Sequence, residues 1–132
     1  MLGDADAAIA KVQDDVRRAQ ARAARFGELR EAIAAVRGRA VSRARDVAVE
    51  VDSAGGVTDL RISDAALDRG GSRLSAEIVG LISMAGRDAR RSTADVAGGI
   101  LGDDDPTVAA LRTALEKDEA GVRAGGASWP VK

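Results

Sequence analysis

Apolar residues along this chain follow helical spacing first, then strict alternation, then helical spacing again. Between 4 and 34 they recur every three or four positions, which predicts one long helix with a heptad-like stripe. The stripe consists of Ile9, Val12, Val16, Ala19, Ala23 and Phe26, and Leu29, Ile33 and Val36 continue it after a three-residue shift. Such a helix is about 45 Å long at ~1.5 Å per residue. Because it outruns a small core, we expect its far end to pack on a partner.

Alternation in the middle of the chain predicts three antiparallel strands. The first covers 36–42, although the long helix could instead run on through it, and the others cover 47–51 and 57–62. A turn at 43–46 joins the first two strands, and the segment Asp52-Ser53-Ala54-Gly55-Gly56 supplies the second turn, because glycine adopts positive φ without steric cost. The sheet would have one apolar face to bury.

Helical spacing returns after a loop around 65–67. It predicts a second long helix that begins at Ser72, with Ser75 as the alternative cap, and ends near Asp95. Asp105 and Pro106 mark the start of a short helix over about 106–120, and 121–132 reads as a flexible tail. The expected fold is α+β, in the order α-β-β-β-α, with residues 1–95 as the domain and 96–132 as a C-terminal extension.

Composition narrows the function classes. The 132 residues include neither Cys nor His, which excludes disulfides, thiolate chemistry and the usual histidine bases and zinc sites, so we expect no enzyme. The acids at 103–105 lack the spacing of a calcium loop and fit a helix cap better, so no metal site is predicted. Aromatic residues make up only 2% of the chain, and a core of small aliphatic side chains leaves a monomer marginally stable. We therefore expect burial between subunits.

Charge is unevenly distributed, although the net charge is only −1. Residues 11–45 hold ten basic and four acidic residues, a net +6, whereas 46–86 hold three basic and seven acidic residues, a net −4. A chain of this kind can present a basic face while remaining acidic overall.

Three groups of arginines are candidates for phosphate contacts. They are Arg17, Arg18, Arg22 and Arg25 in the first helix, Arg37, Arg39, Arg43 and Arg45 in the first strand and turn, and Arg87, Arg90 and Arg91 in the second long helix. The alternatives are a solvated helix face paired with nearby acids, protection of a strand edge, and a favourable interaction with the end of a helix dipole. No aromatic residues lie between these arginines, so binding through phosphates of a duplex is favoured over base stacking on single strands.

Three central segments of the sequence resemble the YbaB/EbfC family of nucleoid-associated proteins, and most closely its divergent actinobacterial members. They are Val49-Glu50-Val51-Asp52, Gly56-Val57-Thr58-Asp59-Leu60-Arg61-Ile62 and Ala65-Ala66-Leu67, and the resemblance covers about 5–95. It implies a homodimer joined through the sheets, long helices that project like tweezers, DNA binding with little sequence preference, and no cofactor. The chain departs from the family pattern in its alanine-rich stripe, its extension at 96–132 and its pI of about 5.5.

Together these features predict a dimeric, nucleoid-associated protein that binds double-stranded DNA through arginine–phosphate contacts. The face shared by the subunits would consist of Val47, Val49, Val51, Leu60 and Ile62. With no apolar window long enough for a membrane span and no signal-peptide pattern, we expect a cytoplasmic location at the nucleoid. The alternative is a protein-interaction or chaperone-like factor of the same fold, associated with type VII secretion, that engages a protein partner through 106–132.

Overall fold

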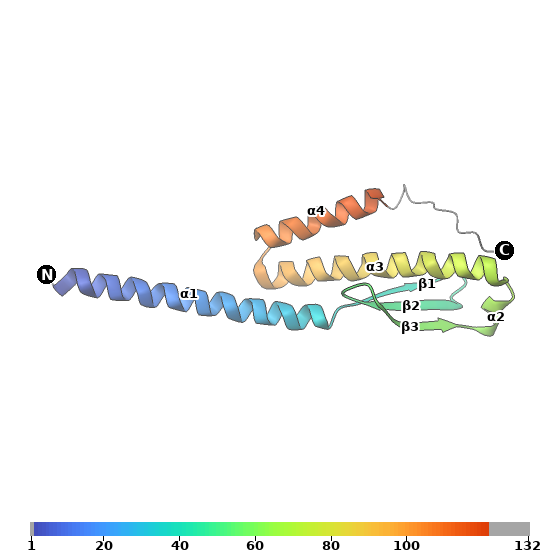
Figure 1. Cartoon of the computed structure of the whole chain (residues 1–132), viewed down its shortest axis with the longest axis horizontal. Coiled ribbons are helices and arrows are strands. Elements are labelled where there is room, and N and C mark those ends of the chain that lie inside the picture. The colour runs from blue at the N-terminus through green and yellow to red at the C-terminus, as the bar shows by residue number, and fades with distance from the viewer. Residues whose placement is uncertain (1, 122–132) are drawn as a thin grey trace.

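The computed structural model describes residues 2–121 and has the α+β fold predicted from the sequence. Its elements are, in order, α1 (Leu2–Ala34), β1 (Arg37–Val41), β2 (Val47–Asp52), β3 (Val57–Ile62), α2 (Asp64–Leu67), α3 (Gly71–Leu101) and α4 (Pro106–Gly121). Figure 1 shows that α3 lies along the sheet, α4 folds back along α3, and α1 projects beyond every other element. The tail predicted for 121–132 lies, from residue 122 on, outside the described residues.

The three strands form an antiparallel sheet in the order β1-β2-β3, with α3 packed on one face. In β2 every second side chain points toward α3, and there Val47, Val49 and Val51 are no more than 2% exposed. They pack with Leu81 and Ala85 of α3 in the main hydrophobic core. Burying such side chains is the largest favourable contribution to folding, and α3 provides the cover within one chain.

This packing corrects the expected subunit interface. The sequence alone placed Val47, Val49 and Val51 on a face shared between subunits, but α3 of the same chain already covers all three valines. The same face continues onto β3, where Leu60 lies opposite Val49 in the register. Every residue of β3 is exposed. Of the five residues predicted for the subunit interface, Leu60 and Ile62 are therefore the two that remain accessible to a second copy.

Glycine at position 38 sets how closely β1 approaches α3. A Cβ at Gly38 would lie 2.0 Å from the backbone oxygen of Ala85 and 2.6 Å from the backbone nitrogen of Ala89. No side chain fits in that space, so the strand and the helix are in direct backbone contact. The outer edge of β1 is held as well, because the amide of Arg39 donates to Asp88 Oδ2 at 2.9 Å.

The hairpin between β2 and β3 has the turn chemistry that the sequence predicts. The carboxylate of Asp52 accepts hydrogen bonds from the amides of Ala54 at 3.0 Å and Gly56 at 2.9 Å. Gly55 adopts a φ of 89°, the left-handed region that favours glycine. The prediction of this turn is confirmed.

Two features of the helices differ from the prediction. First, α3 continues to Leu101 instead of ending near Asp95, so the predicted boundary at 95/96 lies inside a helix. Gly98 does not break the helix: a Cβ there would lie 2.6 Å from Asp103 Oδ1, so the missing side chain lets the following loop approach α3. The helix ends instead at Gly102, whose φ is 89°. Second, Ala66 is fully buried, and the loop expected around it forms the single turn of α2.

A second hydrophobic cluster joins α1, α3 and α4. Leu29, Ala97 and Val108 are buried at its centre, and Ile33 and Leu111 pack against them. The start of α4 is confirmed as predicted, because Asp105 Oδ1 accepts the amide hydrogen of Thr107 at 2.8 Å. Within residues 2–121, no helix is apolar over a stretch long enough to cross a membrane.

Candidate nucleic-acid interface

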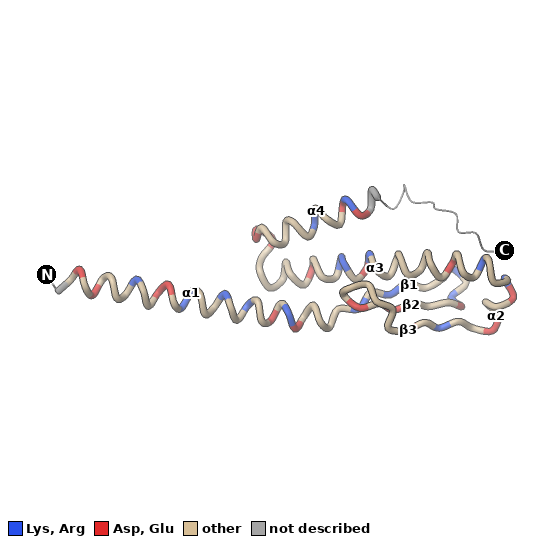
Figure 2. The backbone as a smooth tube through the Cα atoms, in the orientation of Figure 1, with Lys and Arg blue, Asp and Glu red and all other residues tan. Residues whose placement is uncertain are grey.

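The first group of candidate arginines lies on a helix that stands away from the rest of the molecule. We call residues 3–26 of α1 the arm, and every one of them is exposed. The first buried residue of α1 is Leu29, which is 7% exposed. Arg22, Arg25 and Phe26, at the inner end of the arm, line a recess together with Leu101 and Asp105 of the body. Figure 2 shows basic and acidic residues distributed along the arm, most of which extends beyond α3 and the sheet.

The arm carries Arg17, Arg18, Arg22 and Arg25 within three turns of helix. Arg18 forms an ion pair with Asp14 at 3.4 Å, and both side chains remain more than half exposed. Arg22 lies over the ring of Phe26, 5.7 Å from its centroid. Exposed pairs of this kind contribute little to stability and are easily exchanged for another anion, so all four guanidinium groups are accessible to phosphates.

The second group is divided between the sheet and the turn that follows β1. Arg37 donates to the carbonyl oxygens of Ala34 at 3.1 Å and Val36 at 2.7 Å, so it caps the end of α1. Arg39 forms an ion pair with Glu50 on β2, at 2.9 Å. Arg43 and Arg45 are exposed in the β1–β2 turn, where Arg45 has a φ of 59°. The four arginines therefore do not form one continuous surface.

The third group lies on α3, beside α4. Arg90 forms an ion pair with Asp118 of α4 at 2.7 Å, while Arg87 is partly buried and Arg91 is exposed. These residues lie on the sheet side of the contact between α1 and α3, whereas the arm extends in the other direction (Figure 2). Within one chain, the structure does not bring the arginines of α3 and those of the arm together.

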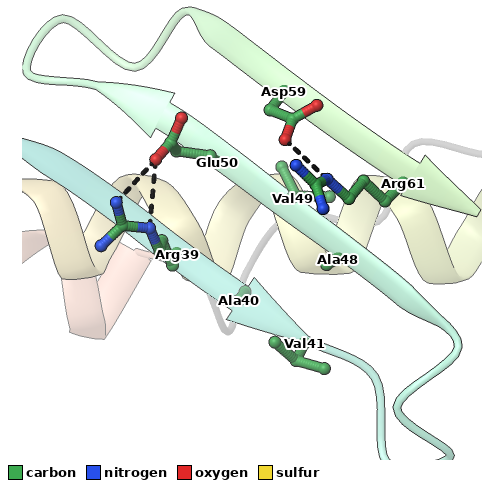
Figure 3. A pocket seen from close by; sticks show the side chains of 8 residues that line it. All are labelled: Arg39, Ala40, Val41, Ala48, Val49, Glu50, Asp59 and Arg61. Atoms are coloured by element: carbon green, nitrogen blue, oxygen red, sulfur yellow. Dashed lines mark hydrogen bonds and ion pairs between the residues drawn. The ribbon is translucent and has the colours of Figure 1, made fainter.

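The face of the sheet opposite α3 carries a further arginine that the sequence reasoning missed. Arg61 of β3 and Arg39 of β1 lie there on either side of β2, and both help to line an open recess of about 350 Å³ (Figure 3). Each is balanced by a carboxylate, because Arg61 Nε lies 3.0 Å from Asp59 Oδ2 and Arg39 pairs with Glu50. With two positive and two negative side chains, this recess has no net charge to attract phosphate.

Arg69 is also accounted for by the fold. Its guanidinium forms two hydrogen bonds with Asp46, at 2.6 and 2.8 Å, and an ion pair with Glu77 at 2.9 Å. These hydrogen bonds, together with one from the Ser42 hydroxyl, lower the pKa of Asp46 to about 2. The bidentate arrangement fixes the β1–β2 turn against α3 and leaves Arg69 no role in binding. Nothing in the local sequence around Arg69 signals this contact.

Comparison with known families decides the broad function. The model of the YbaB/EbfC DNA-binding family matches residues 7–104, which is most of the chain. The chain belongs to the YbaB/EbfC family. It is therefore a member of a nucleoid-associated, DNA-binding family, as the central segments of its sequence indicated.

The family match covers the arm, the sheet and α3 but stops at the start of α4, which lies outside it. The chain has no significant match among curated proteins or among solved structures. Within residues 2–121, no group of three or more potential metal-ligating side chains is found. The candidate residues are arginines, and guanidinium groups are suited to reversible binding of phosphate.

Proposed function

We propose that this YbaB/EbfC protein is a cytoplasmic homodimer that binds double-stranded DNA at the nucleoid, largely without sequence preference. The contacts are made mainly by Arg17, Arg18, Arg22 and Arg25 of the arm, with Arg43 and Arg45 of the β1–β2 turn as additional phosphate contacts. Arg37, Arg39 and Arg90 are engaged by groups of their own chain and contribute less.

The observation that carries this proposal is the exposure of the arm. Four guanidinium groups lie within roughly 12 Å along one helix, given ~1.5 Å per residue. Within the described residues, an acid partner is found for one of the four, Arg18. Arginine forks bind phosphate oxygens without reading the bases, so this arrangement favours affinity over sequence preference.

The dimer is supported by the open part of the sheet. Leu60 is 43% and Ile62 37% exposed, on the face that α3 covers over β1 and β2. As the last strand of the sheet, β3 also presents one unpaired edge. A second copy placed against β3 would bury these side chains and remove the edge from solvent.

The alternative, a protein-interaction factor that uses α4, is disfavoured by packing. Val108 of α4 is fully buried, and Leu111 packs in the same cluster against α3. The apolar side chains that would engage a protein partner are therefore already used within the chain.

The proposal is tested by fluorescence anisotropy of a labelled duplex of 20–30 base pairs, titrated with the protein from low to physiological salt. We expect saturable binding. The logarithm of the association constant should fall linearly with the logarithm of the salt concentration, with a slope near −0.9 for each phosphate neutralised. Absence of binding at low salt would contradict a role in DNA binding.

The position of the contacts is tested by replacing Arg17, Arg18, Arg22 and Arg25 with Ala. Alanine preserves the helix, so the loss of affinity should be electrostatic. We expect weaker binding to every DNA sequence, and a salt dependence of the association constant whose slope is less steep by up to roughly 3.6. Replacement of the same four by Lys keeps the charge and serves as one control, and Arg73→Ala, an exposed charge outside the proposed contacts, serves as another. Equal affinity of the alanine variant and wild type would exclude the arm as the binding site.

A further inference from the structure

The outer part of the arm has an apolar stripe that no other residue of the described part of the chain covers. Ile9, Val12 and Val16 are 56, 60 and 48% exposed, and Phe26, at the inner end of the stripe, is 36% exposed. With Ala19 and Ala23 between them, these residues recur at intervals of 3, 4, 3, 4 and 3, the spacing of a helix that packs against another helix. The apolar side chains with this spacing on α3 pack against the sheet, whereas Ile9, Val12 and Val16 of the arm pack against nothing within the described residues.

The charges of α1 indicate which surface fits this stripe. Residues 2–15 carry four acids and one Lys, a net −3, whereas 16–34 carry five Arg and two Glu, a net +3. A second α1 in antiparallel orientation would place the acidic half of each helix beside the basic half of the other. A parallel second α1 would align like charges instead, which is unfavourable.

We propose that two copies of the chain associate through their arms, which pack against each other in antiparallel orientation. The association goes beyond the DNA-binding function proposed above and does not depend on it. The occupant of the stripe is thus the same stripe of a second copy.

One register satisfies both the apolar and the charged positions. When Ile9 lies opposite Phe26 of the second copy, Val12 lies opposite Ala23 and Val16 opposite Ala19, so larger side chains meet smaller ones along most of the contact. Of the residues that immediately precede Ile9, Val16 and Ala23, every second position of the stripe, Asp15 and Arg22 carry charge. In this register Asp15 lies beside Arg22 of the second copy, and the symmetric pair forms at the same time.

The flanking positions on the other side of the stripe agree with this register. Gln13 and Gln20 each follow a stripe residue, and they too face each other twice across the two-fold axis. In a parallel pair, Asp15 would instead lie near Gln20 and Arg22 near Gly27, and neither charge would be matched. Orientation is therefore specified by Asp15 and Arg22, while the apolar stripe supplies the attraction.

The pairing leaves most of the arm's positive charge accessible. Arg18 and Arg25 precede the other stripe positions, Ala19 and Phe26, and on the helix they and Arg17 face the outer surface of the pair. Of the four arginines of the arm, only Arg22 is therefore engaged by the second copy. DNA binding and arm pairing can therefore coexist.

The absence of Cys from the chain permits a direct test by disulfide cross-linking. Two proteins, one with Val12→Cys and one with Ala23→Cys, are mixed under mild oxidation and analysed on non-reducing gels. We expect the mixed disulfide to form at least ten times faster than either self-disulfide. In the antiparallel register two copies of position 12 are roughly 16 Å apart along the axis, whereas a disulfide needs Cα atoms within about 7 Å.

The matched control is a mixture of Asp14→Cys and Ala21→Cys proteins. These two positions lie at the same level of the antiparallel pair but face outward, so their cross-linking measures random collision. All four sites are exposed, and the substitutions leave the core untouched. If the self-disulfides formed faster than the mixed disulfide, the arms would pair in parallel. If the mixed disulfide formed no faster than that of the control mixture, the arms would not pair at all. Either result overturns the proposal.

A charge exchange tests the role of Asp15 and Arg22. Added to both cysteine proteins, Asp15→Arg should slow the mixed disulfide roughly tenfold, because each arm then meets two like charges. Adding Arg22→Asp to that variant restores opposite pairs and should return the rate to near its original value. Failure of the second change to rescue the first would overturn the proposed register.

Discussion

Nε of Arg90 on α3 lies 2.7 Å from Oδ2 of Asp118 on α4, so a guanidinium proposed as a phosphate contact is held by a carboxylate of its own chain. The two side chains are 43 and 47% exposed, and α4 lies outside the part of the chain that the family model matches. If DNA approaches Arg90, its phosphates would have to compete with this carboxylate.

Replacing the carboxylate should release the arginine. We expect Asp118→Asn to raise the affinity for duplex DNA at low salt, and to steepen the salt slope by up to about 0.9, which corresponds to one additional phosphate contact. Stability should change by less than about 1 kcal/mol, because exposed ion pairs contribute little. The measurement is the anisotropy titration, with Glu116→Gln, an exposed neighbour on α4, as the matched control. An unchanged slope would exclude Arg90 from the DNA contacts.

Substitutions on β2 and β3 should separate folding from association. Val49 is 2% exposed in the core of one chain, so Val49→Asp should unfold the protein, since it buries a charge without a partner. Leu60 is 43% exposed, so Leu60→Asp should keep the fold and weaken the proposed sheet-mediated dimer. Circular dichroism reports the first effect, and sedimentation velocity the second. A Leu60→Asp protein that associates as strongly as wild type would exclude the open face of β3 as the interface.

The contact between β1 and α3 should not tolerate a methyl group. Gly38→Ala would place Cβ within 2.0 Å of a backbone oxygen, so the strand must move, and we expect a loss of about 3 kcal/mol or more in the free energy of unfolding. The control is Gly80→Ala, at an exposed helical position with nothing within 4 Å of the new atom. There the substitution should stabilise α3 by up to about 1 kcal/mol. Urea unfolding measures both, and a Gly38→Ala protein as stable as wild type would contradict the close packing.

The contact between Asp46 and Arg69 should make stability depend on acid pH. The pKa of Asp46 falls from 3.8 to about 2 on folding, chiefly because Arg69 donates hydrogen bonds to the carboxylate. A lowered pKa in the folded state stabilises the protein above the unfolded value, and this contribution is lost as the pH falls from about 5 to about 2.

Unfolding by urea between pH 7 and pH 2 measures this dependence. Asp46→Asn should be less stable than wild type at pH 7 and should lose less stability on acidification. Asp104→Asn, which removes an exposed carboxylate, should follow the wild-type curve. If the Asp46→Asn curve ran parallel to that of wild type, the contact would not be the source of the acid sensitivity.

The sequence predicted the strands well because alternation and turn chemistry are local. Val47, Val49 and Val51 share one face by their spacing alone, and the acid and glycines of the hairpin turn lie within five residues of each other. Alternation does not say which element covers that face. The valines were assigned to a second subunit, but the cover comes from α3 of the same chain.

Long-range contacts explain the remaining differences. The second long helix was predicted to end near Asp95, before Gly98, because the close approach of Asp103 that favours glycine at position 98 becomes visible only when the loop is folded. The partners of Arg39 and Arg90 are 11 and 28 positions away along the chain, so no local pattern shows that these side chains are engaged. By contrast, the spacing of the apolar residues predicted both the helical stripe of the arm and its extension beyond the core, and the structure shows Ile9, Val12 and Val16 exposed there.

The length of the arm has a consequence for how the molecule meets a duplex. Residues 3–26 extend roughly 36 Å at ~1.5 Å per residue, close to one turn of the double helix, about 34–36 Å. A rod of that reach, laid along DNA, has both of its ends beside the same groove. If the arm lies along DNA in this way, an insertion or deletion in α1 would put its two ends out of phase with the duplex while leaving the folded body unchanged.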